Sequence, residues 1–550
     1  MVQLLWAKDS SLWPKELIHS NPALAKMDWV SLPDGMAQFL ESVSQFLVSA
    51  DADGLVDHAL LTSESLNLSA RAFLDLPAAT RRRKVVIFDS TAPETIQNNK
   101  QQLDLRQTLF VLSNKAHYGL RDHCLFLYFR EKLQALLGNR ASRHFLSETE
   151  PGTYLATISR GYTFREIRPD VTAIPATYCS LMQFGGVLTA TAAAPAEEII
   201  AAVRQIQTSC SSTDSPDANP ALQLAAFLTC SALGRRPYLA FLVSPSLIAY
   251  ARRLAQLVGG SMAQGSAGLI PIIWPLPSPT DGLQRRTVFA VLSYKDDDDT
   301  EINKTISELQ SNAEPFIHIR IEDPADLLTE TFKWEAATIL ACARLASDPF
   351  DIDQSRVPRA FGREILEQLA HGNNPLQRSA RITNSFLELY ADGATRSEIS
   401  TLSLTEALRS FLRIPTPGQH VSLIIDIPRT EELHEKFVVL RNLLSTTLVR
   451  PVLMAFGPYA GEYAEHFFRH SLPYGPSIIF TTDSLTDEPI PGANYTFGQL
   501  HQLMALSEYD ALVHWHRPVI RLHLLQDFPA ALDQMLSVFR QALQRFQPAV

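Results

Sequence analysis

Short, continuously apolar segments alternate with longer helix-patterned segments along most of this 550-residue chain. Runs that are apolar on both faces are typical of parallel strands covered by helices on both sides. Eleven β-rich segments are candidate strands, and several of them are continuous apolar runs: residues 85–90, 109–114, 145–148, 238–244, 269–273, 287–294, 316–321, 421–427, 451–457, 477–482 and 519–524. Helix patterns lie between them, for example at 120–137, 197–208, 246–258, 330–346 and 430–447. The alternation predicts an α/β protein with doubly wound, mainly parallel sheets.

The net charge of −10 argues against nucleic-acid and anionic-membrane partners, which need clustered Lys and Arg. No uninterrupted apolar stretch approaches the roughly 18 residues that a membrane-spanning helix needs. The five cysteines are scattered without a C-x-x-C pair, which is typical of reduced thiols in the cytoplasm rather than of disulfides or a zinc site. We therefore expect a cytoplasmic protein, and nothing in the sequence predicts a metal or a cofactor.

An ordered series of short motifs resembles the glucose-6-phosphate isomerase family. The motifs are LWAKDSSLW (5–13), VIFDST (86–91), LFVLSNK (109–115), ETEPGT (148–153), DPFD (348–351), PIPG (489–492) and YTFG (495–498). The chain is most similar to the isomerase half of bacterial transaldolase/glucose-6-phosphate isomerase fusions. The series runs through nearly the whole chain, and the order of the motifs is more specific than any one of them.

The resemblance implies two sugar-isomerase (SIS) domains of three αβα layers, with a sugar-phosphate cleft between them. A segment rich in Ser, Thr, Asp and Pro at 208–220 looks like the linker between the two halves. We expect a helical N-terminal segment at 1–50, a first SIS-like domain at 51–207, a linker at 208–230, a second SIS-like domain at 231–530 with a helical insertion at about 350–420, and a C-terminal helix at 531–550.

Aldose–ketose isomerisation needs a carboxylate base and a cation that stabilises the developing oxyanion. The family carries its base in a Glu-Ser-x-Gly-Lys sequence, and here Gly260 stands at the Glu position and Gln264 at the Lys position. The family's cation lies in Gly-Gly-Arg, and Thr177 replaces that Arg. A hydroxyl cannot supply the fixed charge of a guanidinium, so the resemblance implies a site without its base and its cation.

The phosphate anchors and the remaining acid/base groups have also changed. Glu64 stands in the family's Gly-Gly-Ser-Ser turn, and a carboxylate there would repel a phosphate. His501 corresponds to the C-terminal Lys of the family and could carry partial positive charge. The ring-opening histidine belongs to a stretch that offers three candidates, Glu462, His466 and His470. Candidate substrate-binding residues at family positions are Ser113, Tyr178 and Ser261.

Two functions remain open. The first is a non-catalytic family member that binds, regulates or assembles with a partner, such as a transaldolase or another sugar-phosphate enzyme, in the context of glycolysis and gluconeogenesis. The second is an active isomerase with relocated groups, which requires His501, Glu462 and His466 to converge in one cleft. In either case a sugar phosphate is the expected ligand, and the resemblance implies a homodimer.

Overall fold

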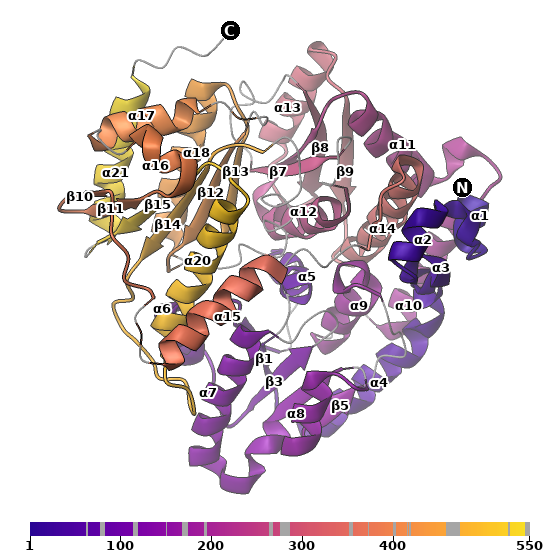
Figure 1. The fold of residues 1–550 in the computed structure, drawn as a ribbon. Helices are drawn as coiled ribbons and strands as arrows, with labels where there is room; N and C mark the ends of the chain where they lie inside the picture. Colours follow the sequence, from indigo (N-terminus) through magenta and orange to yellow (C-terminus); the bar gives the residue numbers. More distant parts are fainter. Residues whose placement is uncertain are drawn as a thin grey trace.

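The computed structural model describes residues 1–544 except 62–63, 78–82, 114–118, 150, 168–173, 192–194, 263–267, 276–285, 351–355, 372, 374, 400–402, 415, 417–419, 429, 458–473 and 526–527. Within these residues the strands form three sheets, which we name A, B and C in chain order. Figure 1 shows sheet A in the lower half of the molecule and sheets B and C side by side in the upper half.

Sheet A is a parallel, doubly wound sheet with the strand order β2-β1-β3-β4-β5. Its strands are β1 (Asp57–Leu60), β2 (Val85–Ile87), β3 (Thr108–Ser113), β4 (Phe145–Glu148) and β5 (Arg165–Ile167). The connecting helices are α5 (Glu64–Leu74), α6 (Pro93–Gln101), α7 (Leu120–Leu137), the 3-10 helix η3 (Gly138–His144) and α8 (Tyr154–Tyr162). The winding reverses between β1 and β3, and in such sheets ligands bind beyond the carboxyl ends of the strands at this point.

Sheet B repeats the same winding with the parallel order β7-β6-β8-β9. Its strands are β6 (Tyr238–Val243), β7 (Ile270–Pro275), β8 (Thr287–Tyr294) and β9 (Phe316–Ile321), and its helices are α12 (Ile248–Met262), α13 (Thr300–Ser311) and α14 (Asp326–Leu345). A short 3-10 helix, η6 (Pro245–Leu247), leads into α12.

Sheet C has the order β10-β11-β15-β14-β12-β13, in which β10 and β11 are antiparallel additions to a parallel sheet. Its strands are β10 (Ile382–Thr383), β11 (Leu387–Tyr390), β12 (Val421–Asp426), β13 (Val452–Phe456), β14 (Ser477–Thr482) and β15 (Val519–Leu524). Its helices are α15 (Arg356–Ala370), α16 (Gly393–Ile399), α17 (Leu404–Arg413), α18 (Glu431–Leu448), α20 (Phe497–His514) and α21 (Phe528–Leu543). The segment 350–420, expected to be helical, therefore also contains two strands.

The N-terminal helices and a helical segment between sheets A and B cover one side of the molecule. They are α1 (Val2–Trp6), η1 (Ser10–Leu12), α2 (Lys15–Ser20), α3 (Ala23–Lys26), η2 (Asp28–Ser31), α4 (Leu32–Ala52), η4 (Ala176–Tyr178), α9 (Ser180–Ala190), α10 (Ala196–Ser211), η5 (Pro216–Ala218) and α11 (Pro220–Leu233). Most of the expected linker, 208–230, is thus the end of α10, η5 and part of α11, which packs on α14. The domain boundaries stay predictions.

Alternate residues of each sheet face separate cores, as expected when helices cover both faces. In β6, Leu239 and Phe241 belong to the core shared with α12 and α14, whereas Ala240 and Leu242 face a second core. That second core also receives Ile424 of sheet C, so sheets B and C pack as one unit. The predicted fold class, α/β with doubly wound, mainly parallel sheets in αβα layers, is confirmed.

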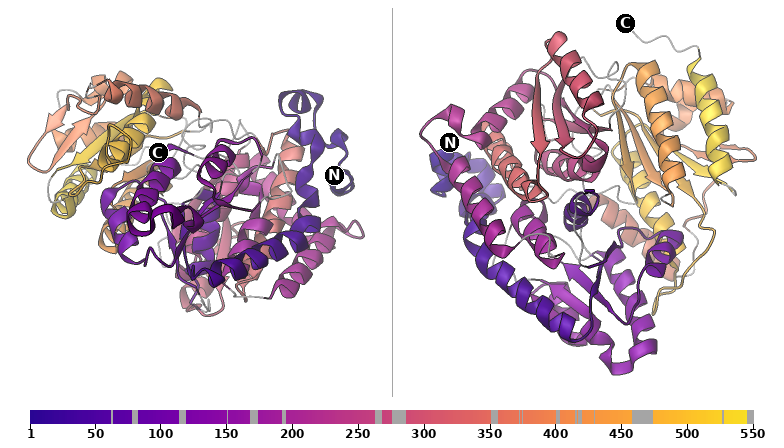
Figure 2. Two further views of the ribbon diagram at one scale, coloured as in Figure 1. Left: turned by 90° about the horizontal axis from the view of Figure 1, so that it is seen from below. Right: turned by 180° about the vertical axis from the view of Figure 1, so that it is seen from behind.

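Two helices join the sheets. Helix α5 packs on α12, and Figure 1 and the right view of Figure 2 place it near the middle of the molecule. Helix α20 of sheet C buries Phe497 and Leu500 in the core of sheet A, and the Phe497 ring meets Tyr128 of α7 edge to face at 5.6 Å. Sheet A and its helices therefore pack against helices from both other sheets.

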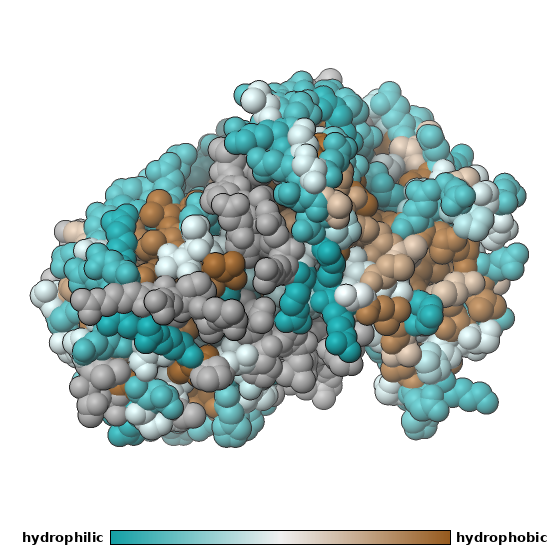
Figure 3. Space-filling model, turned by 90° about the horizontal axis from the view of Figure 1, so that it is seen from above, coloured by the Kyte–Doolittle hydropathy of each residue, from teal (hydrophilic) through white to brown (hydrophobic). Residues whose placement is uncertain are grey.

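Among the described residues, no helix combines the length and the apolar character that crossing a bilayer requires. Hydrophilic residues cover much of the face seen in Figure 3, and hydrophobic residues gather toward its right side.

Candidate functional site

Ser113 lies at the point where sheet A reverses its winding. It ends β3, is buried with 4% of its surface exposed, and pairs in register with Glu148 at the end of β4. The next residues along the chain, 114–118, lie outside the described residues. Ser113 is thus at the edge of the sheet where α/β proteins bind ligands, and its role in binding stays a prediction.

His501 reaches this edge of sheet A from helix α20. Thr496 begins the helix with a capping box, in which its hydroxyl and the Gln499 side chain satisfy each other's backbone N–H groups. His501, five residues later, is 3% exposed, and its Nδ1 lies 3.0 Å from the hydroxyl oxygen of Thr91. Thr91 follows β2, two residues after Asp89, which forms an ion pair with Arg71 of α5 at 3.0 Å.

Tyr178 and Ser261 form a buried hydrogen bond between η4 and the end of α12. Their hydroxyl oxygens are 2.6 Å apart, and each residue is 1% exposed. Because Ser261 donates its one proton to the carbonyl of Pro349, Tyr178 donates to Ser261. The Tyr178 ring also meets Phe350 edge to face at 5.0 Å, and burial raises the pKa of its phenol. Three segments distant in sequence are locked together here.

This bond brings the expected cation and base positions to one junction. Thr177 immediately precedes Tyr178, and Gly260 immediately precedes Ser261. The structure thus joins four sequence-predicted residues from two separate motifs: Thr177, Tyr178, Gly260 and Ser261. The candidates Glu462, His466 and His470, and also Gln264, lie outside the described residues.

A buried arginine beside Thr177 was not predicted from the sequence. The Nη2 atom of Arg253, on α12, donates to the Thr177 carbonyl at 2.7 Å, and its Nε donates to the Ser69 hydroxyl of α5 at 3.3 Å. Arg253 is 0% exposed, and its Nη1 has no hydrogen-bond partner among the described residues. A guanidinium therefore lies next to Thr177, the residue that the motif comparison sets in place of the family's Arg.

Glu335 of α14 is the acidic partner of Arg253, with Oε1 3.6 Å from Nη2 and both side chains fully buried. Its Oε1 accepts the backbone N–H of Ser180 at 3.0 Å, and its Oε2 accepts the indole N–H of Trp29 at 2.9 Å. Burial raises the pKa of the Glu335 carboxyl to about 7, although Arg253 and the two hydrogen bonds oppose this shift. Burial also lowers the pKa of the Arg253 guanidinium.

The chemistry open to this pair is limited by access. A carboxyl with a pKa near 7 has the proton affinity of a general base. However, Glu335 is 0% exposed, and both of its oxygens already accept hydrogen bonds. Within the described structure the pair therefore ties the N-terminal segment, α9, α12 and α14 together. The sequence signal that could have revealed this pair is a charged residue within the apolar stripe of each of two buried helices.

The described residues contain no cluster of three His, Cys, Asp or Glu side chains that could hold a metal ion. His514 and His516, which flank Trp515 at the end of α20, belong to no such cluster in this part of the chain. The described part of the junction offers hydroxyls, backbone carbonyls and the buried pair of Arg253 and Glu335.

No family model matches the chain, and no curated protein sequence matches it. Solved structures do match. A hypothetical protein of Thermus thermophilus is 17% identical over 62% of this chain and 89% of its own, with a TM-score of 0.53. A glucose-6-phosphate isomerase from Chlamydia trachomatis is 15% identical over 62% of this chain and 74% of its own, with a TM-score of 0.50.

The chain has a fold similar to that of a sugar-phosphate isomerase. At these identities the similarity concerns the fold alone, because one scaffold can carry many different sites.

Proposed function

We propose that this protein is a non-catalytic relative of the glucose-6-phosphate isomerases, which binds a sugar phosphate or a partner enzyme without isomerising the sugar. The observation that carries the proposal is the hydrogen bond between Tyr178 and Ser261. It brings Thr177 and Gly260 to one junction, where an isomerase would need a cation and a carboxylate. Neither residue can exchange a proton with a sugar carbon or hold a positive charge.

The packing around this bond supports the same proposal. Tyr178, Ser261, Cys342 and Phe350 are all at most 7% exposed, and Cys342 lies 3.5 Å from the Ser261 carbonyl. Side chains therefore fill the space on the buried side of Thr177 and Gly260. A packed junction suits a protein that keeps the scaffold for binding or assembly.

The proposed setting is sugar-phosphate metabolism in the cytoplasm, as part of glycolysis and gluconeogenesis or beside them. A separate transaldolase is the partner we propose first, because the sequence motifs resemble isomerases that are fused to one. We also propose that the protein forms a homodimer, which light scattering on the purified chain would detect.

The test is a coupled assay in which purified protein receives fructose 6-phosphate and glucose 6-phosphate is detected. Enzymes ordinarily turn over at about 1 s⁻¹ or faster, and we expect a rate at least about 100-fold below that. Calorimetry with fructose 6-phosphate measures binding separately. Turnover above about 1 s⁻¹ that falls in a folded Arg253→Met variant would overturn the proposal, whereas activity unchanged in that variant would identify a contaminant.

One observation favours an isomerase with relocated groups as the second candidate. The guanidinium of Arg253 lies beside Thr177, and its Nη1 has no partner among the described residues. In this alternative Arg253 supplies the charge that Thr177 lacks. This alternative predicts that the wild-type protein isomerises the sugar and that an Arg253→Met variant does not, although the variant remains folded.

A further inference from the structure

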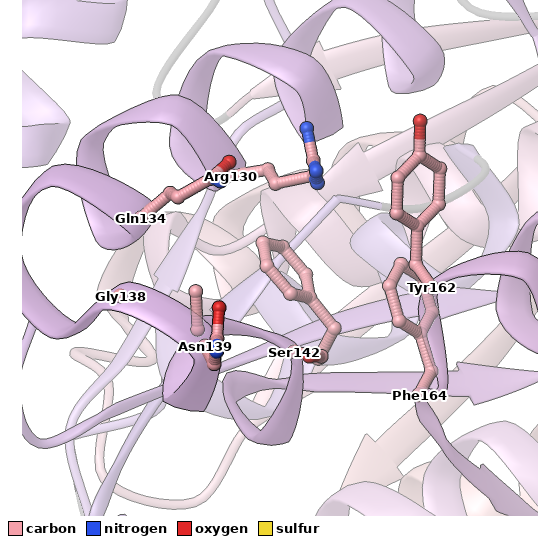
Figure 4. A pocket seen from close by; sticks show the side chains of 9 residues that line it. Arg130, Gln134, Gly138, Asn139, Ser142, Tyr162 and Phe164 are labelled. Carbon is pink, nitrogen blue, oxygen red and sulfur yellow. The ribbon is translucent and has the colours of Figure 1, made fainter.

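A pocket of about 140 Å³ lies at the amino ends of β4 and β5, and Figure 4 shows it from close by. It is the opposite edge of sheet A from Ser113 and the carboxyl ends of the strands, so it is separate from the candidate site described above. Helix α7, the 3-10 helix η3 and the end of α8 enclose it. The side chains that matter for its chemistry are those of Arg130, Gln134, Asn139, Ser142, Tyr162 and Phe164.

Arg130 lines this pocket with a positive charge, and it forms no ion pair with another described residue. Its guanidinium carbon lies 4.4 Å from the centre of the Tyr162 ring, and Figure 4 shows the side chain reaching from α7 toward that ring. The side chain is half-buried, and no carboxylate of the described residues pairs with it. A guanidinium stacked on an aromatic ring keeps its N–H edges free, and these edges match the two oxygens of a carboxylate.

The charge that lines the pocket favours an anion. Of the four basic residues in 130–144, only Arg130 lines the pocket, and the Lys132 amine lies over the Tyr128 ring at 5.1 Å. The guanidinium of Arg130 is therefore the charge that attracts a small anion to this pocket. The carbonyls at the end of α7 carry partial negative charge, so an anionic group fits beside Arg130 and a neutral group fits toward Gly138.

The other wall of the pocket is aromatic, and its volume limits the ligand. Phe164 stacks on Phe145 at 5.1 Å, and Tyr162 stacks on Phe164 at 6.2 Å. Arg130 and Phe164 already pack on the Tyr162 ring, so the aromatic wall offers a ligand its ring edges, and edge-to-face contact with another aromatic ring is favourable. The volume is close to that of the roughly 150 Å³ cavity that takes up benzene, so the pocket has room for one six-membered ring.

We propose that this pocket binds a small aromatic carboxylate of about the size of benzoate. The carboxylate accepts hydrogen bonds from Arg130, and the ring lies against Tyr162 and Phe164. Polar ring substituents would meet the side chains of Asn139 and Ser142. This site goes beyond the proposed function, since it requires neither a sugar nor the junction at Tyr178.

The test is calorimetric titration of the full chain with three probes: benzoate, benzyl alcohol and inorganic phosphate. We expect saturable one-to-one binding of benzoate, and binding at least about tenfold weaker for benzyl alcohol, which lacks the charge. No saturable binding of benzoate up to about 10 mM would overturn the proposal. Phosphate that binds as tightly as benzoate and competes with it would also overturn it, because the rings would then contribute nothing.

Two variants and one control locate the site. Arg130→Met removes the charge but keeps the length, and Ser142→Leu fills the pocket but keeps the charge; each should weaken benzoate binding at least about tenfold. Arg140→Met is the matched control, because Arg140 is exposed, carries the same charge and does not line the pocket. Unchanged binding in both folded pocket variants, or an equal loss in the control, would contradict the assignment.

Discussion

The guanidinium of Arg253 and the carboxylate of Glu335 face each other at 3.6 Å with no exposed surface on either side chain. They connect α12 to α14, and through Trp29 and Ser180 they also hold the N-terminal segment and α9. Taking two charges out of water costs several kcal/mol per ion, which mutual attraction and hydrogen bonds must offset. Such a pair therefore adds little net stability, and its main effect is to determine how the helices pack against each other.

The first prediction concerns this pair. Arg253→Met and Glu335→Leu should each lower the free energy of unfolding by about 3–5 kcal/mol, because each leaves the other buried polar group without its partner. The double variant Arg253→Met/Glu335→Leu should recover a large part of the loss. Urea denaturation of the four proteins gives the coupling energy. As a control, Lys304→Met breaks an exposed pair with Glu301 and should change little. Strictly additive losses would contradict this account.

The raised pKa of Glu335 gives stability a defined dependence on pH. The carboxyl titrates near 4.5 in the unfolded chain and near 7 in the folded protein, so the folded state holds the proton more tightly. Its contribution is therefore fully present below pH 4.5 and is lost as pH rises toward 7. Relative to Glu335→Gln, the wild-type protein should lose about 3 kcal/mol over this interval. Parallel pH profiles for the two proteins would exclude the shift.

His420 should make the stability of the protein depend on pH in the opposite direction. It is 2% exposed just before β12, its Nδ1 lies 3.3 Å from the Tyr238 hydroxyl, and burial, with smaller effects of Arg450 and Arg517, lowers its pKa to about 4. The folded state binds this proton less tightly than the unfolded state, so stability is lost as pH falls from 6.5 toward 4. We expect the wild-type protein to lose about 3 kcal/mol more than His420→Gln over that interval. Thermal unfolding of both proteins at several pH values measures this difference, and equal losses would show that His420 is not the group responsible.

The contrast between strands and site residues shows what the sequence could reveal. All eleven segments predicted as strands contain strands. Most of them, such as β6 and β8, are buried on both faces, and such burial requires a nearly continuous apolar run in the sequence. Strands β1, β5, β10 and β11 were missed because they are two to four residues long and carry charged or polar residues, such as Asp57, Arg165 and Glu388. Their place depends on neighbouring strands, which local sequence does not encode.

The site was only partly predictable for a related reason. Motif comparison pointed to Thr177, Tyr178, Gly260 and Ser261, and they do meet at one junction. Arg253 and Glu335 are 82 residues apart in the sequence (335 − 253). In the sequence alone, each is only an isolated charged residue in the pattern of a buried helix. Only the packing of α12 against α14 makes them partners.

Gly475 tests how closely the backbone packs where His420 enters sheet C. A Cβ at this position would lie 1.8 Å from the His420 carbonyl oxygen, a distance that requires the backbone to move. Gly475→Ala should therefore lower the unfolding free energy by at least about 3 kcal/mol, at the upper end for overpacking. The matched control is Gly35→Ala in α4, where nothing lies within 4 Å and where alanine should add about 0.5–1 kcal/mol. A tolerated Gly475→Ala would mean that these two segments are further apart.

The last prediction separates the two hydroxyls at the junction. Tyr178→Phe removes a donor and leaves Ser261 free to keep its bond to Pro349, so the cost should be about 1 kcal/mol. Ser261→Ala leaves the buried Tyr178 hydroxyl without its acceptor and the Pro349 carbonyl without this donor, so it should cost more, about 2–3 kcal/mol. Tyr154→Phe, at a 60% exposed site, is the control and should have little effect. Chemical denaturation ranks the three variants, and a Tyr178→Phe variant more destabilised than Ser261→Ala would mean that the proton is shared in the reverse direction.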